Sequence, residues 1–269
     1  MLSVDFSFIL FIALLATGVI ILSHKIFSKG KSRDLPRLDT AGNAIRSEPI
    51  IVEYAWALFP VILVVFLLRS FVVEPFRIPS GSMLPSLHIG DFILVNKFSY
   101  GIRLPVINKK VLSVSSPERG DVMVFRYPID PKLNFIKRVI GLPGDTLTYK
   151  DKQLSINGQP IETEDDGRYA YKQVKLKGKS ADQLIETIDD STHKILLDGS
   201  RKSRDLDRVI VPQGHYFVMG DNRDHSNDSR YWRFVPEDNV VGRAFFIWFS
   251  WKSLSGGGVE WSRIGNFIE

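Results

Sequence analysis

The chain has 269 residues, of which 44% are hydrophobic and 24% are charged, a composition that excludes an intrinsically disordered protein. The absence of cysteine excludes disulfides and cysteine-ligated zinc sites, and the five histidines lack metal-ligand spacing. A net charge of +5 is compatible with nucleic-acid binding, but no recognition motif accompanies it. Part of the excess lies in one loop between two apolar segments, where membrane topology explains it more simply.

Two apolar segments open the chain. Residues 6–22 carry no charge, and their length is at the short end for a membrane-spanning helix. No lysine or arginine precedes them, whereas a cleavable secretory signal begins with basic residues, so we expect an uncleaved anchor over residues 1–23. Residues 54–68 form a second charge-free run, interrupted by Pro60. This run predicts a second span over residues 54–73, with a buried core helix as the alternative.

The segment between the spans, residues 24–53, is basic. Its positive residues are Lys25, Lys29, Lys31, Arg33, Arg37 and Arg46. The tip of the chain before the first span has no lysine or arginine. By the positive-inside rule the loop is cytoplasmic, and everything after the second span lies on the outer side of the membrane.

A short turn follows the second span by about ten residues. It reads Pro79-Ser80-Gly81-Ser82-Met83, where the glycine permits a tight turn and the serines on either side offer hydroxyls. Proline, serine and glycine together are most often a solvated turn. A serine that acts as a nucleophile needs a base, and the rest of the chain must supply it.

Short β-prone runs separated by turns make up the chain from Phe92 onward. The clearest runs are residues 92–95, 121–125, 135–140 and 216–219. Such spacing predicts a mainly β fold built on an antiparallel sheet or barrel, with its main domain over residues 74–154 and 207–269. Residues 155–206 are more polar and predict an inserted, smaller β-rich lobe, in which we expect one short helix over residues 181–187.

The chain ends with a strongly aromatic stretch. Residues 244–251 read Ala-Phe-Phe-Ile-Trp-Phe-Ser-Trp. Such a stretch fits a core strand, and it also fits partial insertion at a lipid interface, where tryptophan is favoured. The two interpretations are compatible, one for each face of a strand.

Histidine is the usual base for a serine nucleophile. His215 and His225 flank Gly-Asp-Asn-Arg-Asp at residues 220–224, which would supply a Ser-His-Asp set, and His88 follows Ser82 by six residues. Nothing in the sequence brings any of the three histidines close to a serine.

Lysine is the other option for the base, provided that its pKa is lowered by burial or by nearby positive charge. If residues 134–140 form a strand, Lys137 shares a face with Phe135 and Val139, an apolar setting that favours the neutral amine. Arg138 is excluded because a guanidinium stays protonated. We therefore rank Lys137 first, against the alternative of a structural lysine at a sheet edge or in a salt bridge.

Five sequence blocks occur in a fixed order after the two spans. They are Pro-Ser-Gly-Ser-Met-Leu-Pro at 79–85, Asn-Lys-Phe at 96–98, Arg-Gly-Asp-Val at 119–122, Lys-Arg-Val-Ile-Gly-Leu-Pro-Gly-Asp at 137–145, and Gly-Asp-Asn-Arg-Asp-His-Ser-Asn-Asp-Ser-Arg at 220–230. With them the chain resembles the bacterial type I signal peptidases (leader peptidases), serine proteases with a Ser/Lys dyad. The resemblance covers nearly the whole chain.

This resemblance implies roles for individual residues. Ser82 matches the family's nucleophile and Lys137 its general base. The Ser80 hydroxyl, together with the Ser82 backbone N–H, matches the oxyanion hole, and Ser226 matches the serine that orients the lysine. The residues that match a supporting polar network are Asp221, Arg223, Asp228 and Arg230. Those that match shallow substrate pockets are Phe76, Ile78, Met83, Leu87 and Ile136.

The implied function is a membrane-bound serine endopeptidase that removes N-terminal signal peptides from exported preproteins after a small-x-small motif. Its implied partners are signal peptides, the lipid bilayer and the export translocon, with no nucleic acid, and its location is the bacterial inner membrane with the catalytic domain on the periplasmic side. No metal or organic cofactor is implied. The alternatives are a catalytically silent membrane-anchored binding domain and a Ser-His-Asp hydrolase using His215 or His225.

Overall fold

The computed structural model describes residues 6–28, 37–38, 44–45, 49–103, 110–171, 178–252 and 257–268. The chain divides into two compact units, Met1–Val72 with Leu104–Asn108 and Val73–Arg103 with Lys109–Glu269. Most of the predicted basic loop, including Lys29, Lys31, Arg33 and Arg46, lies outside the described residues, as do residues 172–177 of the predicted inserted lobe.

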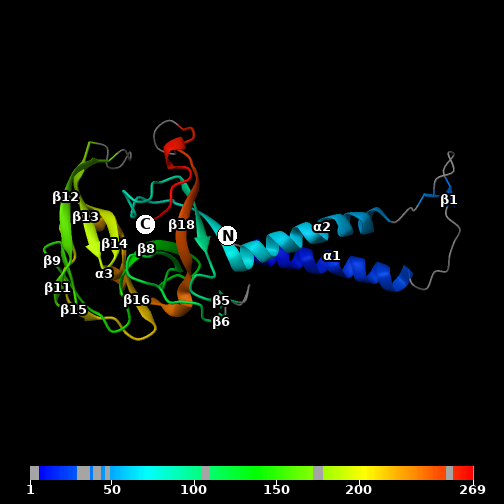
Figure 1. The fold of residues 1–269 in the computed structure, drawn as a ribbon, viewed down its shortest axis with the longest axis horizontal. Helices are drawn as coiled ribbons and strands as arrows, with labels where there is room; N and C mark the ends of the chain where they lie inside the picture. The colour runs from blue at the N-terminus through cyan, green and yellow to red at the C-terminus, as the bar shows by residue number, and fades with distance from the viewer. Residues whose placement is uncertain are drawn as a thin grey trace. The chain divides into compact units, whose positions relative to one another are not determined.

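The first unit contains two long apolar helices that lie side by side (Figure 1). They are α1 (Phe6–Ser28) and α2 (Ile50–Leu67), and a π-helical turn, η1 (Leu68–Val72), continues α2. The Phe11 ring of α1 lies 6.1 Å from the Phe66 ring of α2. By length and composition, Phe8–Ser28 and Ile50–Val72 are each able to cross a membrane.

Both helices are longer than the charge-free runs that predicted them. The first continues through His24 and Lys25, and the second begins early enough to hold Glu53 in its first turn. A lysine near a helix end extends its charge towards the interface, and an acidic residue in the first turn is favoured by the helix dipole. Pro60 lies inside the second helix without ending it.

The second unit is built on a seven-stranded antiparallel sheet with the order β17-β16-β8-β7-β18-β4-β3. Figure 1 labels β8, β16 and β18 of this sheet. Its strands are β3 (Val73–Arg77), β4 (Asp91–Asn96), β7 (Val122–Arg126), β8 (Asn134–Gly141), β16 (His215–Met219), β17 (Val235–Pro236) and β18 (Val240–Ser250). All four β-prone runs predicted from the sequence lie on these strands, except that Asp121 just precedes β7, and the fold is confirmed as mainly β.

Two smaller sheets and several short elements complete the fold. A four-stranded sheet holds β9 (Thr146–Lys150), β10 (Gln153–Ile156), β11 (Gln159–Pro160) and β15 (Leu206–Ile210), and a three-stranded sheet holds β12 (Glu162–Ala170), β13 (Ser180–Ile188) and β14 (Ser191–Leu197). Short pairs are β1 (Arg37–Leu38) with β2 (Ala44–Ile45) and β5 (Ile102–Arg103) with β6 (Lys110–Leu112). The helical turns are η3 (Arg223–His225), α3 (Ser229–Trp232), η4 (Glu237–Asn239) and η5 (Trp261–Arg263).

The short helix expected over residues 181–187 is wrong, because this segment is strand β13. It pairs with β12 on one side and with β14 on the other, so backbone pairing on both edges outweighs the local helix propensity. The predicted lobe boundaries at 154 and 207 fall within β10 and next to the first residue of β15. The division into a main domain and an inserted lobe stays a prediction.

The aromatic stretch at residues 244–251 lies in and just after β18, between β7 and β4 in the large sheet. Ala244 and Ile247 are buried in the core, while Trp248 is 43% exposed. The core-strand interpretation therefore holds for one face of β18. Insertion of the exposed tryptophan at a lipid surface stays a prediction.

The pairing of β7 with β8 decides which way the central side chains point. Met123 lies opposite Lys137, and Phe125 lies opposite Phe135. Because side chains alternate along a strand, these residues share one face of the sheet, and Arg138 projects from the other. The lysine thus enters an apolar layer, as predicted, and the arginine reaches a separate polar region.

Candidate active site

Ser82 stands on the loop that connects β3 to β4, which we call the Ser82 loop (residues 78–90). Two backbone hydrogen bonds close its base, from Ile78 N–H to Asp91 O at 2.8 Å and from Gly90 N–H to Ile78 O at 3.0 Å. The side chains of Met83 and Leu87, which belong to this loop, are fully buried. These contacts anchor the loop to the core, and Ser82 itself is 8% exposed.

The structure brings Ser82 and Lys137 together, although they are 55 residues apart in the chain. Lys137 Nζ lies 2.7 Å from Ser82 Oγ and donates to the Ile136 carbonyl oxygen, also at 2.7 Å. A neutral amine that donates to the carbonyl keeps its lone pair for the serine hydroxyl. This pair therefore has the geometry of a nucleophile and its base.

The surroundings of Lys137 favour the neutral amine. Burial lowers the pKa of Lys137 from 10.5 to about 8, with the negative charges of Asp228 and Asp221 opposing the shift and Arg230 supporting it. The Phe135 ring contributes to this dry setting, with its centroid 5.6 Å from Lys137 Nζ. With a pKa of about 8, roughly a tenth of the amine is neutral at pH 7.

Two further serines lie near Ser82. Ser80 Oγ is 3.4 Å from Ser82 Oγ, on the exposed side of the loop. Ser226 is buried, and no hydrogen bond joins its hydroxyl to Lys137, so the structure brings it to the site without connecting it to the amine. Gly220 makes this approach possible, because a Cβ there would lie 2.3 Å from Ser226 Oγ and 2.4 Å from the Ser82 carbonyl oxygen.

Two of the candidate histidines bind elsewhere. His215 Nδ1 lies 3.0 Å from the Gln213 carbonyl oxygen. His225 contacts Arg201 at 2.8 Å through Nδ1 and Asp198 at 2.9 Å through Nε2. Because arginine only donates, Nδ1 accepts and Nε2 carries the hydrogen given to the carboxylate. These contacts favour the lysine over His215 and His225 as the partner of Ser82.

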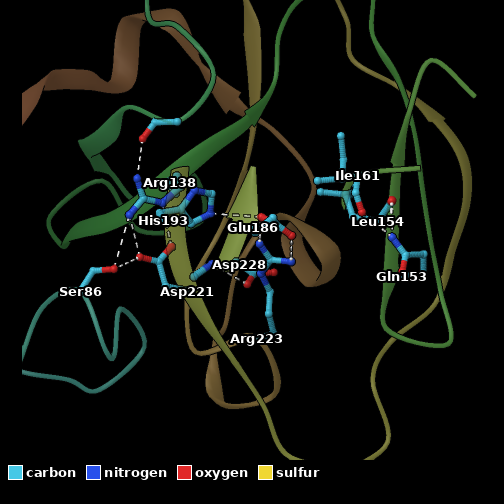
Figure 2. A network of polar contacts seen from close by, with 12 residues as sticks. Ser86, Arg138, Gln153, Leu154, Ile161, Glu186, His193, Asp221, Arg223 and Asp228 are labelled. Atoms are coloured by element: carbon cyan, nitrogen blue, oxygen red, sulfur yellow. Dashed lines mark hydrogen bonds and ion pairs between the residues drawn. The ribbon is translucent and has the colours of Figure 1, made fainter. Parts of the chain in front are cut away.

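A buried ion pair lies on the face of β8 opposite to Lys137 (Figure 2). Arg138 donates to both carboxylate oxygens of Asp221, at 2.9 and 2.8 Å, and to the Gly120 carbonyl oxygen at 2.7 Å. The Ser86 hydroxyl donates to Asp221 at 2.5 Å. Burial alone raises the pKa of Asp221, but Arg138 outweighs it and holds that pKa below its ordinary value.

The other predicted network residues form two more pairs. Arg230 donates to both oxygens of Asp228, at 2.9 and 2.8 Å, and holds the pKa of Asp228 below its ordinary value in spite of burial. Arg223 makes a bidentate pair with Glu186 of β13. His193 Nε2 of β14 lies 3.1 Å from the same Glu186 carboxylate, as Figure 2 shows.

Three members of this network escaped the sequence analysis. Ser86, Glu186 and His193 lie outside the sequence block at 220–230 that holds Asp221 and Arg223. An isolated acid or histidine on a polar segment is usually solvated, so no pattern distinguished Glu186 and His193. Ser86 had one available signal, since it belongs to the Ser82 loop.

The residues predicted to form substrate pockets divide into two groups. Phe76, Ile78 and Ile136 line a pocket between β3 and the start of β8. Met83 and Leu87 are fully buried in the core cluster that contains Ile78. They therefore support the wall of the pocket from below rather than line it.

Comparison with known proteins agrees with this geometry. Residues 51–251 match the family described as "Signal peptidase, peptidase S26". The chain is 46% identical over 276 residues to a signal peptidase I of Pseudomonas fluorescens, covering 93% of both chains. It is 48% identical over 240 residues to that of Pseudomonas aeruginosa, covering 82% of this chain and 81% of the relative. A signal peptidase I of Buchnera aphidicola is 41% identical, covering 77% and 79%. The chain therefore belongs to the bacterial type I signal peptidases, serine endopeptidases of peptidase family S26.

Proposed function

We propose that this chain is a membrane-anchored endopeptidase that removes signal peptides from exported preproteins by a Ser/Lys mechanism. The observation that carries the proposal is the 2.7 Å contact between Ser82 Oγ and a buried Lys137 Nζ. The two apolar helices supply the anchor. The predicted topology, with a cytoplasmic loop at residues 24–53 and the catalytic unit on the periplasmic side of the inner membrane, belongs to this proposal, as does contact with the export translocon.

The reaction follows from the position of these groups. Ser82 Oγ attacks the carbonyl carbon before the scissile bond while its proton passes to Lys137 Nζ. The carbonyl oxygen becomes an oxyanion that accepts from the Ser80 hydroxyl and the Ser82 N–H. Collapse of the intermediate breaks the C–N bond, and Lys137 returns the proton to the leaving amine. A water molecule then gives one proton to Lys137 Nζ while its oxygen attacks the acyl carbon. The C–Oγ bond breaks, and Lys137 returns that proton to Ser82 Oγ, which regenerates the serine hydroxyl and the neutral amine.

Other residues support this chemistry in our proposal. Ser226 orients the Lys137 amine once substrate orders the site. The Arg138–Asp221 and Arg230–Asp228 pairs hold the backbone around it, because a bidentate buried pair fixes both of its partners.

The substrate binds as an extended strand. β16 pairs only with the second half of β8, so among the described strands residues 134–137 have no strand partner on that side. β3 is the last strand of the sheet and also has one side without a strand partner there. A peptide that pairs with these edges passes the pocket lined by Phe76, Ile78 and Ile136. Those walls exclude large side chains sterically, which selects a small-x-small motif.

A purified preprotein tests the proposed function directly. We expect the enzyme in detergent or lipid to cut a signal ending in Ala-x-Ala after the second alanine, read by mass spectrometry of the products. Tryptophan in place of that alanine should abolish cleavage, because the pocket has no room for it. Tryptophan at the x position is the matched control and should be tolerated. Absence of cleavage of the Ala-x-Ala substrate by folded enzyme would overturn the proposal.

The pH dependence of kcat/KM follows from Lys137. The amine must be neutral to accept a proton, so the active fraction falls as pH drops below about 8, the pKa that burial sets. We expect kcat/KM to rise about tenfold per pH unit up to that value and then level off. The measurement is a pH–rate profile on a peptide substrate without ionisable groups near the cut. A plateau reaching down to pH 6 would contradict a lysine base.

Replacement of Ser80 by alanine should slow the reaction without weakening substrate binding. Its hydroxyl is 3.4 Å from Ser82 Oγ, where it can reach an oxyanion formed there. Loss of one such donor typically lowers kcat by about 100-fold to 1000-fold. Steady-state kinetics should show this fall at nearly unchanged KM, and Ser80→Thr should keep most of the activity. A fall confined to KM would instead assign the side chain to substrate binding.

A further inference from the structure

Asn222 binds the Ser82 loop at two consecutive residues. Its backbone N–H donates to the Ser82 carbonyl oxygen at 3.0 Å, and its side-chain Nδ2 donates to the Gly81 carbonyl oxygen at 2.9 Å. Asn222 is 1% exposed, so water does not compete for these bonds. The side chain comes from a segment 141 residues further along the chain.

The bond to Gly81 determines where the Ser82 N–H points. The Gly81 carbonyl and the Ser82 N–H belong to one planar peptide group, and in a trans peptide they point in opposite directions. A donor that holds the carbonyl on one side therefore aims the N–H to the other side. Glycine at residue 81 gives this peptide unusual rotational freedom. Within the loop the Leu84 N–H also donates to the Gly81 carbonyl oxygen, at 3.3 Å, and the Asn222 amide adds the shorter bond from outside the loop.

Tyr171 fixes the orientation of the Asn222 side chain. Its hydroxyl donates to Asn222 Oδ1 at 2.8 Å, and this bond requires the oxygen to face the tyrosine and the NH₂ group to face Gly81. Tyr171 is 3% exposed and follows β12 of the three-stranded sheet. It shares a buried cluster with Leu84 of the Ser82 loop and Leu196 of β14.

We propose that Asn222 and Tyr171 are positioning residues for the oxyanion hole, which orient the Gly81–Ser82 peptide so that the Ser82 N–H faces the reacting carbonyl. The inference rests on the proposed function, and it gives the three-stranded sheet a part in catalysis. Neither residue touches the reacting atoms. They act through a peptide group that does.

The test compares Asn222→Ala and Tyr171→Phe with the wild-type chain on one peptide substrate. A misaimed N–H weakens only the transition state, so we expect Asn222→Ala to lower kcat about 100-fold with KM changed less than about threefold. Tyr171→Phe keeps the ring and loses the hydroxyl, and should lower kcat about tenfold. Two matched controls should keep wild-type kcat: Asn239→Ala removes an amide bond to the Arg126 carbonyl oxygen, and Tyr100→Phe removes a buried hydroxyl bond to Asp121.

A peptide aldehyde gives a readout that does not depend on turnover. Ser82 Oγ adds to its carbonyl carbon, the hydroxyl proton passes to Lys137 Nζ, and the carbonyl oxygen becomes an oxyanion that needs the oriented N–H. We expect aldehyde affinity to fall in Asn222→Ala by about the same factor as kcat, while the affinity of the matching peptide alcohol, which cannot add, stays unchanged.

The outcomes separate the inference from the function on which it rests. If the wild-type chain cleaves and both variants keep its kcat, the positioning role is wrong and the proposed function stands. Equal loss of aldehyde and alcohol affinity, with lowered thermal stability, would assign Asn222 to general folding and overturn the inference. Absence of wild-type cleavage and of aldehyde binding would overturn both proposals.

Discussion

Replacing Lys137 with methionine is expected to lower kcat/KM at least about 1000-fold, because the variant has no base for the Ser82 proton. The same replacement should make the protein more stable. Methionine keeps the aliphatic length of lysine in a site that is 4% exposed, and it removes a charge that burial disfavours.

The sign of the stability change follows from the two pKa values of Lys137. The unfolded value is 10.5 and the folded value is about 8, so the unfolded chain binds the proton more tightly. Stability therefore falls as pH drops from about 10.5 to about 8 and stays low below that range, where both states carry the charge. The lower pKa of Lys137 in the folded chain corresponds to about 3 kcal/mol of lost stability at pH 7.

Denaturant unfolding in detergent measures this gain. We expect Lys137→Met to raise the free energy of unfolding by about 3 kcal/mol at pH 7 and by less than about 1 kcal/mol at pH 10, where the wild-type lysine is already largely neutral. Lys132→Met is the matched control, since Lys132 is exposed just before β8. A variant that keeps its activity, or one destabilised at pH 7, would contradict the assigned role.

Ser82→Ala should lose cleavage almost completely, by about 10⁴-fold or more in kcat, since no hydroxyl remains to form the acyl-enzyme. Substrate affinity should be retained, because the pocket residues Phe76, Ile78 and Ile136 do not depend on the hydroxyl. Equilibrium binding of a fluorescent signal peptide measures affinity, and the cleavage assay measures loss of chemistry.

An exposed serine supplies the control for Ser82→Ala. Ser115 donates its hydroxyl to the Ser99 carbonyl oxygen at the surface, and Ser115→Ala should cleave like the wild-type chain. Trapping an acylated wild-type enzyme and locating the label on Ser82 would add direct evidence. Cleavage by Ser82→Ala at the wild-type rate would remove Ser82 from the mechanism and require another nucleophile.

The contact between Ser82 and Lys137 could be anticipated from local chemistry together with a family resemblance. Residues 134–140 alternate in a way that puts Lys137 among apolar neighbours, and β8 has that arrangement with Met123 opposite the lysine. The strand positions could be anticipated for the same reason, because turn residues bound each β-prone run. A local sequence pattern is sufficient to predict a strand where buried and exposed side chains alternate regularly along it.

What the sequence could not predict depends on contacts between distant segments. Glu186 pairs with Arg223, and Tyr171 with Asn222, between distant segments of the chain that share no sequence pattern. Segment 181–187 looks helical locally, yet two neighbouring strands determine its conformation. Met83 and Leu87 were assigned to the pocket from their positions in the sequence, but both side chains are fully buried. How deeply a side chain is buried depends on the folded core and cannot be seen in a local pattern.

The long sequence separations between residues of the site affect how the active site forms during folding. Ser82 meets Lys137 across 55 residues, Ser86 meets Asp221 across 135, and Gly81 meets Asn222 across 141. Contacts between residues so far apart in the sequence form late and slowly in folding, because closing a long loop costs entropy before the contact can stabilise the chain. In a partly folded chain Ser82 and Lys137 are therefore still apart, and the serine has no base beside it. We expect proteolysis to appear only after residues 221 and 222 have docked against the Ser82 loop, so that its recovery on refolding reports assembly of the site.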